Sequence, residues 1–294
     1  MTAARQTSLR VGDRLIDLST PQIMGILNTT PDSFSDGGKL QTGDDQGGFR
    51  VSVDKAVVAA EAMVAAGASI IDVGGESTRP GAAAVSEQEE IDRVLPVVEA
   101  ISDRIDVLIS VDTSTPRVMS EALAAGAGLI NDVRALAVPG ALEAVAASSA
   151  AVCLMHMRGQ PRTMQEDIVY TDLIEEVFGF LQERMQCCEA AGIARDRIAL
   201  DPGFGFGKTV MHNYQLLSRL ERFHALQAPL LIGLSRKSMI GHIVERPVDD
   251  RLAGTLAATV YALQYGASII RTHDVAATLD VIRIHGAMRA AQSM

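Results

Sequence analysis

Several side chains that could do chemistry stand at the ends of short apolar runs. Asp112 follows one such run, Asn131 lies near the end of a second, and Asp201 follows a third. Two carboxylates and a carboxamide offer the acceptors and amide donors that suit a heterocycle with several N–H and C=O groups. Lys237 follows a further run and could donate to a ring carbonyl or nitrogen. We interpret these four residues as a candidate heterocycle site.

Cationic side chains also occur near the ends of apolar runs. Arg79, Arg271 and His273 suit a phosphate or diphosphate. His273 could instead be a general base, but its position beside Arg271 favours an anion contact. Asn28 and Asp32 offer oxygen ligands, and Mg²⁺ commonly takes one or two of these while substrate phosphates supply others. The sequence alone therefore indicates a heterocycle that is joined to a diphosphate.

One of these polar ends opens a glycine-rich segment, residues 200–208 (LDPGFGFGK). Glycines leave little side-chain bulk, so the backbone could approach a ligand closely and the two phenylalanines could form pocket walls. The alternative is a flexible loop with two incidental aromatic residues. His156 also ends an apolar run, and we interpret it as a packing histidine behind the site.

These residues can meet only if the fold brings the ends of the apolar runs together. Eight short apolar runs, each followed by a helix-sized interval, are predicted to be strands. They cover residues 23–27, 69–73, 107–111, 129–133, 152–155, 198–200, 230–234 and 269–274. Near-continuous apolar strands are typical of parallel sheets, and eight such units in 294 residues favour an α/β fold, the (β/α)₈ barrel. An open doubly wound sheet is the alternative.

Other elements follow from local patterns. Residues 9–18 alternate around a Gly-Asp turn and predict a short β-hairpin. Helical spacing of apolar residues predicts helices over 52–66 and 171–191, the second with Thr171 as its N-cap. The polar loop at 29–48 has the length of a lid or binding loop. No stretch resembles a linker, so we expect one domain over 1–294, with the barrel at about 22–290.

Composition narrows the class of ligand. The net charge of −10 and the absence of Trp argue against nucleic-acid binding, so an anionic ligand must meet locally placed cations. Three cysteines form no Cys-x-x-Cys pair, which favours reduced thiols in the cytoplasm. Neither an apolar leader nor a run near the ~18 apolar residues of a membrane helix is present in the sequence, so we expect a cytoplasmic protein without membrane contact.

Eight segments taken together resemble the dihydropteroate synthases of bacterial folate biosynthesis. They are residues 24–38 (MGILNTTPDSFSDGG), 71–81 (IDVGGESTRPG), 109–113 (ISVDT), 130–132 (IND), 154–157 (LMHM), 200–208 (LDPGFGFGK), 235–238 (SRKS) and 270–274 (IRTHD). The segment of residues 39–48 looks longer than the corresponding segment of the family. This puts the dynamics of the loop in question but leaves the motif intact.

The resemblance implies a (β/α)₈ barrel that couples 6-hydroxymethyl-7,8-dihydropterin diphosphate to p-aminobenzoate. It also implies an SN1-like, Mg²⁺-dependent reaction, inhibition by sulfonamides, and a homodimer. The implied catalytic residues are Asp112, Lys237 and Arg271, and the implied pterin ligands are Asp112, Asn131, Asp201 and Lys237. The implied diphosphate ligands are Asn28, Thr78, Arg79, Arg271 and His273, with Asn28 and Asp32 at the metal. The implied p-aminobenzoate neighbours are Phe34, Pro80, Phe206, Lys237 and Ser238.

Two other functions stay open at this point. A related pterin-binding barrel that passes a methyl group from methyltetrahydrofolate to a corrinoid protein would share the Asp/Asn/Asp set, but it has no need for the diphosphate cations. A catalytically silent pterin-binding paralogue would share the fold, although intact Asn28, Arg79, Lys237 and Arg271 argue against it.

Overall fold

The computed structural model describes residues 6–30, 41–43, 49–77, 85–159, 164 and 168–292. Eight parallel strands form one sheet in the order β10-β9-β8-β7-β6-β3-β12-β11. A parallel bridge between Leu200 and Leu230 joins β10 to the strand at the other edge, so the sheet closes into a barrel. The strands are β3 (Gln22–Asn28), β6 (Ile70–Gly74), β7 (Leu108–Asp112), β8 (Leu129–Asp132), β9 (Ala151–Met155), β10 (Ile198–Asp201), β11 (Leu231–Gly233) and β12 (Ile269–Thr272). The predicted (β/α)₈ barrel is confirmed, and the open doubly wound sheet is wrong.

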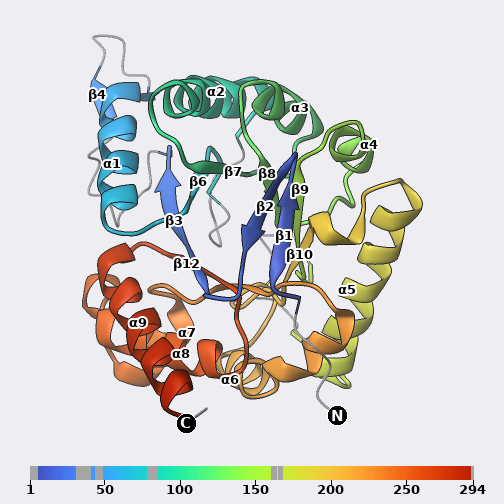
Figure 1. Ribbon diagram of the computed structural model, residues 1–294. Coiled ribbons are helices and arrows are strands. Elements are labelled where there is room, and N and C mark those ends of the chain that lie inside the picture. The colour runs from blue at the N-terminus through green and yellow to red at the C-terminus, as the bar shows by residue number, and fades with distance from the viewer. Residues whose placement is uncertain are drawn as a thin grey trace.

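Helices surround the strands, as Figure 1 shows. They are α1 (Val53–Ala65), α2 (Glu87–Arg104), α3 (Pro116–Ala124), α4 (Ala141–Ala146), α5 (Leu173–Ala190), α6 (Val210–Ser218), α7 (Ser238–Val244), α8 (Leu252–Gln264) and α9 (Val275–Gln292). α5 begins two residues later than predicted, because the Asp172 side chain, and not Thr171, accepts from the backbone N–H groups of Ile174 and Glu175. A carboxylate is the stronger partner for these unpaired donors and for the helix dipole.

Two short antiparallel ribbons complete the chain. The predicted N-terminal hairpin is β1 (Ser8–Val11) paired with β2 (Arg14–Asp17). A second ribbon, β4 (Gln41–Gly43) with β5 (Phe49–Val51), lies in the region that was expected to be a polar loop, and the sequence analysis missed it. Its polar, glycine-rich sequence lacks the apolar alternation that marks a half-buried strand.

The barrel interior divides into an apolar lower part and a polar upper part. Because side chains of a strand alternate between its two faces, every second residue points into the barrel. Apolar residues from the first half of the strands pack there against Leu9, Val11 and Leu18 of the hairpin region, and this inner cluster also contains Met24, Ile70, Leu129, Ala151, Cys153, Ala199, Leu231 and Ile269. The hairpin therefore closes the amino-terminal end of the barrel, and the open end is where the strands finish.

Candidate functional site

The upper interior gathers polar side chains from neighbouring strands. The register places Asp112 of β7 opposite Asn131 of β8 and opposite Gly74 of β6. Asn131 and Asp201 are buried, with 5% of each residue exposed. The barrel thus brings together the carboxylates and carboxamide that the sequence indicated as a heterocycle site, and it places them at one end as expected for this fold.

Arg271 of β12 connects this group through two ion pairs. Its Nε lies 2.6 Å from Oδ2 of Asp72, and its Nη2 lies 2.9 Å from Oδ2 of Asp112. One guanidinium therefore joins β12 to β6 and β7 across the barrel. The planar, multi-donor shape of arginine suits this bridging role, which a lysine ammonium could not reproduce with the same geometry.

Asp72 is the member of the site that the sequence analysis missed. It is fully buried in the middle of β6. Besides Arg271, it accepts from Ser110 Oγ at 2.6 Å and from Asn131 Nδ2 at 3.2 Å. The available signal was a lone carboxylate inside an otherwise apolar strand, because an ionised group survives there only if partners satisfy it.

The pKa of Asp112 is raised to about 7. Burial is the main cause, the Arg271 guanidinium opposes it, and the nearby carboxylates of Asp72, Asp132 and Glu90 add to the rise. Burial alone would lower the pKa of Arg271, but Asp72 and Asp112 together raise it above its usual value, so this guanidinium stays charged. Asp112 can consequently be charged or neutral near pH 7.

Asp201 and Lys237 form the other side of the site. Asp201 Oδ1 accepts from the backbone N–H of Gly203 at 2.7 Å, and burial raises the pKa of Asp201 while Lys237 opposes the rise. Lys237 Nζ donates to the backbone carbonyl of Phe204 and lies 4.9 Å from the centre of the Phe206 ring. Burial lowers the pKa of Lys237 to about 8, against the opposing effect of Asp201.

The two phenylalanines of the glycine-rich segment have different environments. Phe204 is fully buried in the large hydrophobic cluster between strands and helices, so the idea that both rings line a pocket is wrong for this one. Phe206 is half-buried beside Lys237 and can face a ligand. Ser238 begins α7 and is exposed. Phe206 and Ser238 thus remain available as neighbours of a second substrate.

The predicted diphosphate ligands are only partly described. His273 Nδ1 lies 2.9 Å from Ser235 Oγ, next to the end of the strand that carries Arg271. Five predicted site residues lie outside the described residues, namely Asp32, Phe34, Thr78, Arg79 and Pro80.

Asn28 is the described residue that suits a metal. It ends β3, and its Oδ1 lies on the side of Gly74 that also faces Asp112, since a Cβ built on Gly74 would be 3.8 Å from this oxygen and 3.6 Å from the Asp112 Cβ. The described residues contain no cluster of three or more His, Cys, Asp and Glu side chains that could hold a metal ion by themselves. A single amide oxygen fits Mg²⁺ that takes its remaining ligands from water and substrate phosphate.

None of the described helices is both long and apolar enough to cross a bilayer.

Comparisons with known proteins agree on one family. Residues 24–273 match the model of the pterin binding enzymes. The chain is 54% identical over 269 residues to a dihydropteroate synthase of Escherichia coli (strain K12), which covers 92% of each chain. It is similar to the crystal structure of the Yersinia pestis dihydropteroate synthase in complex with a sulfonamide drug, with a TM-score of 0.90 at 52% identity and coverage of 96% of this chain and 99% of that one.

A second solved structure adds another ligand. The dihydropteroate synthase of Xanthomonas albilineans with 4-aminobenzoic acid has a TM-score of 0.87 at 46% identity, covering 97% of this chain and 99% of that one.

Replacing Asp72 by Asn tests whether its charge holds the site together. The change keeps the size of the side chain but removes one of the two carboxylates that compensate Arg271. Breaking a buried ion pair typically costs about 3–5 kcal/mol, and since Asp112 remains, we expect the free energy of unfolding to fall by about 3 kcal/mol. Urea unfolding followed by circular dichroism measures it.

The matched control is Asp54→Asn, which removes an exposed carboxylate that pairs with Arg104 at 3.3 Å. Exposed pairs contribute little, so the control should unfold at the wild-type urea concentration. Equal stability of Asp72→Asn and wild type would contradict the role given to Asp72.

Proposed function

The chain belongs to the dihydropteroate synthase family of pterin-binding enzymes, and from this premise we propose its reaction. It condenses 6-hydroxymethyl-7,8-dihydropterin diphosphate with p-aminobenzoate to give 7,8-dihydropteroate and pyrophosphate, a transferase step of folate biosynthesis. The observation that carries the proposal is the convergence of Asp112, Asn131, Asp201 and Arg271 inside the carboxyl-terminal end of the barrel.

The pterin is held by Asp112, Asn131, Asp201 and Lys237. The two carboxylates accept from ring N–H groups, while the Asn131 carboxamide and Lys237 donate to ring acceptors. Asp112, Asn131 and Asp201 end their strands or lie within them, so the barrel sets their positions, and Lys237 is placed by the start of α7 directly after it. Such preorganised groups bind without the cost of ordering them.

Asp112 also has the role of stabilising charge during the reaction. Loss of the diphosphate leaves positive charge on the pterin methylene, and the ring delocalises it. A carboxylate fixed beside the ring lowers the energy of that cation, and its effect is large because the site is buried. The arylamine of p-aminobenzoate is neutral at pH 7, so it can attack without a strong base.

Residues at the open end hold the leaving group. Arg271, His273, Thr78 and Arg79 are the proposed cations and donors for the diphosphate. Asn28, with Asp32, would hold Mg²⁺ there, and the ion when bound supplies charge neutralisation to the departing pyrophosphate. Arg271 already lies against Asp112, so it can contact the leaving group while it stays anchored to the pterin site.

The second substrate occupies the outer part of the site. Lys237 Nζ lies 4.9 Å from the centre of the Phe206 ring, so an amine and an aromatic ring are neighbours beside the proposed pterin site. Ser238, the first residue of α7, adds an exposed hydroxyl next to Lys237. With Phe34 and Pro80, these residues form the proposed p-aminobenzoate site, which sulfonamides would share.

The two alternative functions differ in what they require. A methyltransferase that uses methyltetrahydrofolate would need no diphosphate, and residues 31–38 and Arg79 would have no role in it. A silent pterin-binding paralogue would bind the first substrate and release nothing.

Pyrophosphate release decides among these functions. Purified protein with both substrates and Mg²⁺ should release pyrophosphate and form 7,8-dihydropteroate in equal amounts, as followed by a coupled phosphate assay and chromatography. EDTA should abolish the release, and a sulfonamide should raise the apparent KM for p-aminobenzoate without changing kcat. Pterin binding without pyrophosphate release would favour the silent paralogue and refute the synthase.

The pH dependence tests the role of Asp112. The pKa of about 7 means that the reactive carboxylate is lost below this pH, and the Lys237 pKa of about 8 means that its positive charge is lost above it. We expect kcat/KM for the pterin substrate to be bell-shaped, with its maximum between these values. Asp112→Asn should lower kcat about 100-fold, in the range known for lost electrostatic stabilisation of a transition state, and remove the acidic limb.

Asp54→Asn serves again as the control and should keep the wild-type profile. An unchanged acidic limb in Asp112→Asn would assign that limb to another group, such as Asp201, whose pKa is also raised by burial.

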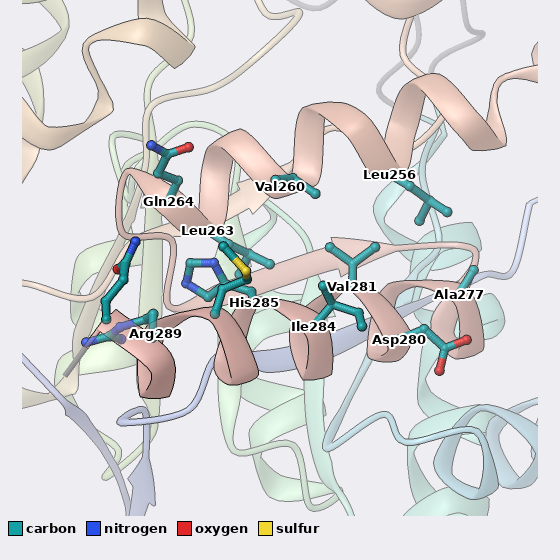
Figure 2. A pocket seen from close by; sticks show the side chains of 12 residues that line it. Leu256, Val260, Leu263, Gln264, Ala277, Asp280, Val281, Ile284, His285 and Arg289 are labelled. Atoms are coloured by element: carbon teal, nitrogen blue, oxygen red, sulfur yellow. The ribbon is translucent and has the colours of Figure 1, made fainter. Parts of the chain in front are cut away.

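We also propose a homodimer that forms through the α7–α8–α9 face. Seven of the eleven large hydrophobic side chains exposed in the described residues lie on these helices, and they are Ile243, Val244, Leu252, Val260, Tyr261, Ile284 and Met288. A groove of about 700 Å³ runs between α8 and α9, as Figure 2 shows, and it is lined by Leu256, Val260, Val281 and Ile284 among others. Apolar surface gathered in this way is typical of an interface, and a second copy would offer the same surface across a two-fold axis.

Light scattering coupled to gel filtration tests the dimer. Wild type should have twice the 31.2 kDa mass of one chain, and Ile284→Glu should shift it to the mass of one chain. Met211→Glu is the matched control, because Met211 on α6 is 67% exposed against 68% for Ile284. A wild-type mass of one chain would refute the homodimer.

A further inference from the structure

Lys208 is a buried amine at the end of the glycine-rich segment, and the proposed reaction does not use it. Only 2% of the residue is exposed. Its Nζ lies 2.8 Å from the Gly203 carbonyl oxygen, 3.1 Å from that of Phe206 and 2.9 Å from Nδ1 of His156. The His156 carbonyl oxygen is a fourth acceptor at 3.4 Å, and two of the four acceptors belong to the segment itself. Burial lowers the pKa of Lys208 well below its usual value, and these acceptors give each of its N–H groups a partner.

The same segment is docked on the backbone that follows β9. A Cβ on Gly203 would come within 1.8 Å of the His156 carbonyl oxygen, and one on Gly207 within 2.5 Å of that of Arg158. Their φ angles of 75° and 62° also lie in the region that favours glycine. These two glycines are therefore required by contact with residues 156–158, and not by the approach of a ligand.

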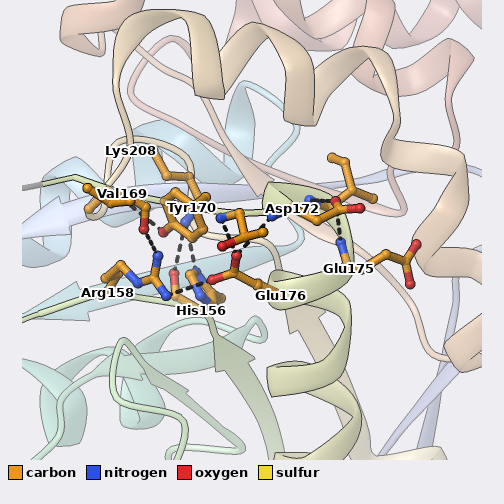
Figure 3. A network of polar contacts seen from close by, with 11 residues as sticks. His156, Arg158, Val169, Tyr170, Asp172, Glu175, Glu176 and Lys208 are labelled. Carbon is orange, nitrogen blue, oxygen red and sulfur yellow. Dashed lines mark hydrogen bonds and ion pairs between the residues drawn. The ribbon is translucent and has the colours of Figure 1, made fainter.

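Described residues between β9 and α5 support this arrangement, and Figure 3 shows Arg158 and Tyr170 beside His156 and Lys208. Tyr170 donates from its hydroxyl to the Gly207 carbonyl at 2.9 Å, and the Arg158 guanidinium lies 4.1 Å from the Tyr170 ring centre. The His156 ring meets Phe180 of α5 edge-on at 5.0 Å. Burial is the main cause that lowers the pKa of His156 to about 2, and the neighbouring Lys208 and Arg158 add to it, so this ring is neutral and its Nδ1 can accept from Lys208.

Both ends of the segment reach the proposed substrate site. The Gly203 N–H donates to Asp201, the Phe204 carbonyl accepts from Lys237, and the Phe206 ring lies against Lys237. Any change in the shape of residues 203–207 would therefore move the groups that face p-aminobenzoate.

We propose that Lys208 is a positioning residue for the second substrate. By donating to the carbonyls of Gly203 and Phe206 and to His156, it folds residues 203–207 into one shape, which fixes Phe206 and the carbonyl that receives Lys237. The inference rests on the proposed function, because it assigns these groups to the p-aminobenzoate site. Lys208 itself contacts neither substrate.

The test compares Lys208→Met with Lys55→Met, which makes the same change at an exposed position on α1. Methionine keeps the apolar stem and removes every donor. We expect the KM for p-aminobenzoate to rise about tenfold, as for one lost buried hydrogen bond. The Kd of the pterin diphosphate, titrated calorimetrically without p-aminobenzoate, should rise by a smaller factor than this KM, because two of its four proposed ligands, Asp112 and Asn131, lie on strands that the substitution does not touch.

Hydrogen exchange supplies a second readout that needs no turnover. Peptides that cover residues 202–209 should take up deuterium faster in Lys208→Met than in Lys55→Met, while peptides from α3 and β8 should not differ. Unchanged KM and unchanged exchange would overturn the proposal. An equal loss of affinity for both substrates would also overturn it, because it would indicate a general loss of structure.

If Lys208→Met does not fold, Tyr170→Phe decides, since it removes only the hydroxyl that supports Gly207. A smaller rise in the KM for p-aminobenzoate with unchanged pterin affinity is expected, and wild-type values for both KM and exchange would overturn the proposal. If wild type releases no pyrophosphate, the proposed function fails, and the exchange data still show whether Lys208 shapes the segment.

Discussion

Arg271 lies inside the barrel with a carboxylate on either side, and the polar interior depends on this contact. Asp72 and Asp112 come from neighbouring strands, and without the guanidinium between them two like charges would face each other in a buried space. Burying an unpaired charge is costly, so the strands could not carry both carboxylates without a shared cation. Ser110 and Asn131 also donate hydrogen bonds to Asp72. The negative charge of Asp112 is therefore the less fully compensated of the two.

The division of the barrel interior into an apolar and a polar part strengthens the ion pairs of Arg271 with Asp72 and Asp112. Below the polar residues, the hairpin region and the inward residues of the strands form a dry cluster that seals the amino-terminal end. Electrostatic interactions are stronger where water is excluded, and the same burial raises the pKa of Asp112 toward neutrality.

Much of this arrangement follows from patterns that are local in sequence. Apolar runs with polar ends predicted the strands and the convergence of Asp112, Asn131 and Asp201, because parallel strands in a barrel end on one face. Asp72 was missed because it lies within an apolar run and not at its end. It can be recognised only because it lies on the same inward face of the strand as Ile70 and Gly74. The role of Lys208 was missed for another reason. Its partners are backbone carbonyls and a histidine 52 residues away, and no pattern in the sequence predicts contacts of this kind.

The two carboxylates of the proposed pterin site are held in different ways, and this difference suits a reaction with two substrates. Asp112 is fixed by a strand and by Arg271, so its position and charge depend on the barrel alone. Asp201 ends a strand but also accepts from Gly203, the first glycine of the segment that carries Phe206. A ligand bound to Asp201 would therefore act on the same backbone that carries Phe206, the proposed wall for the second substrate. In the proposed reaction, recognition of the pterin and preparation of the p-aminobenzoate site are coupled through two hydrogen bonds of this segment, Asp201 with Gly203 and Lys237 with Phe204. Asp112, the group proposed to stabilise the cation, belongs to the rigid part of the barrel.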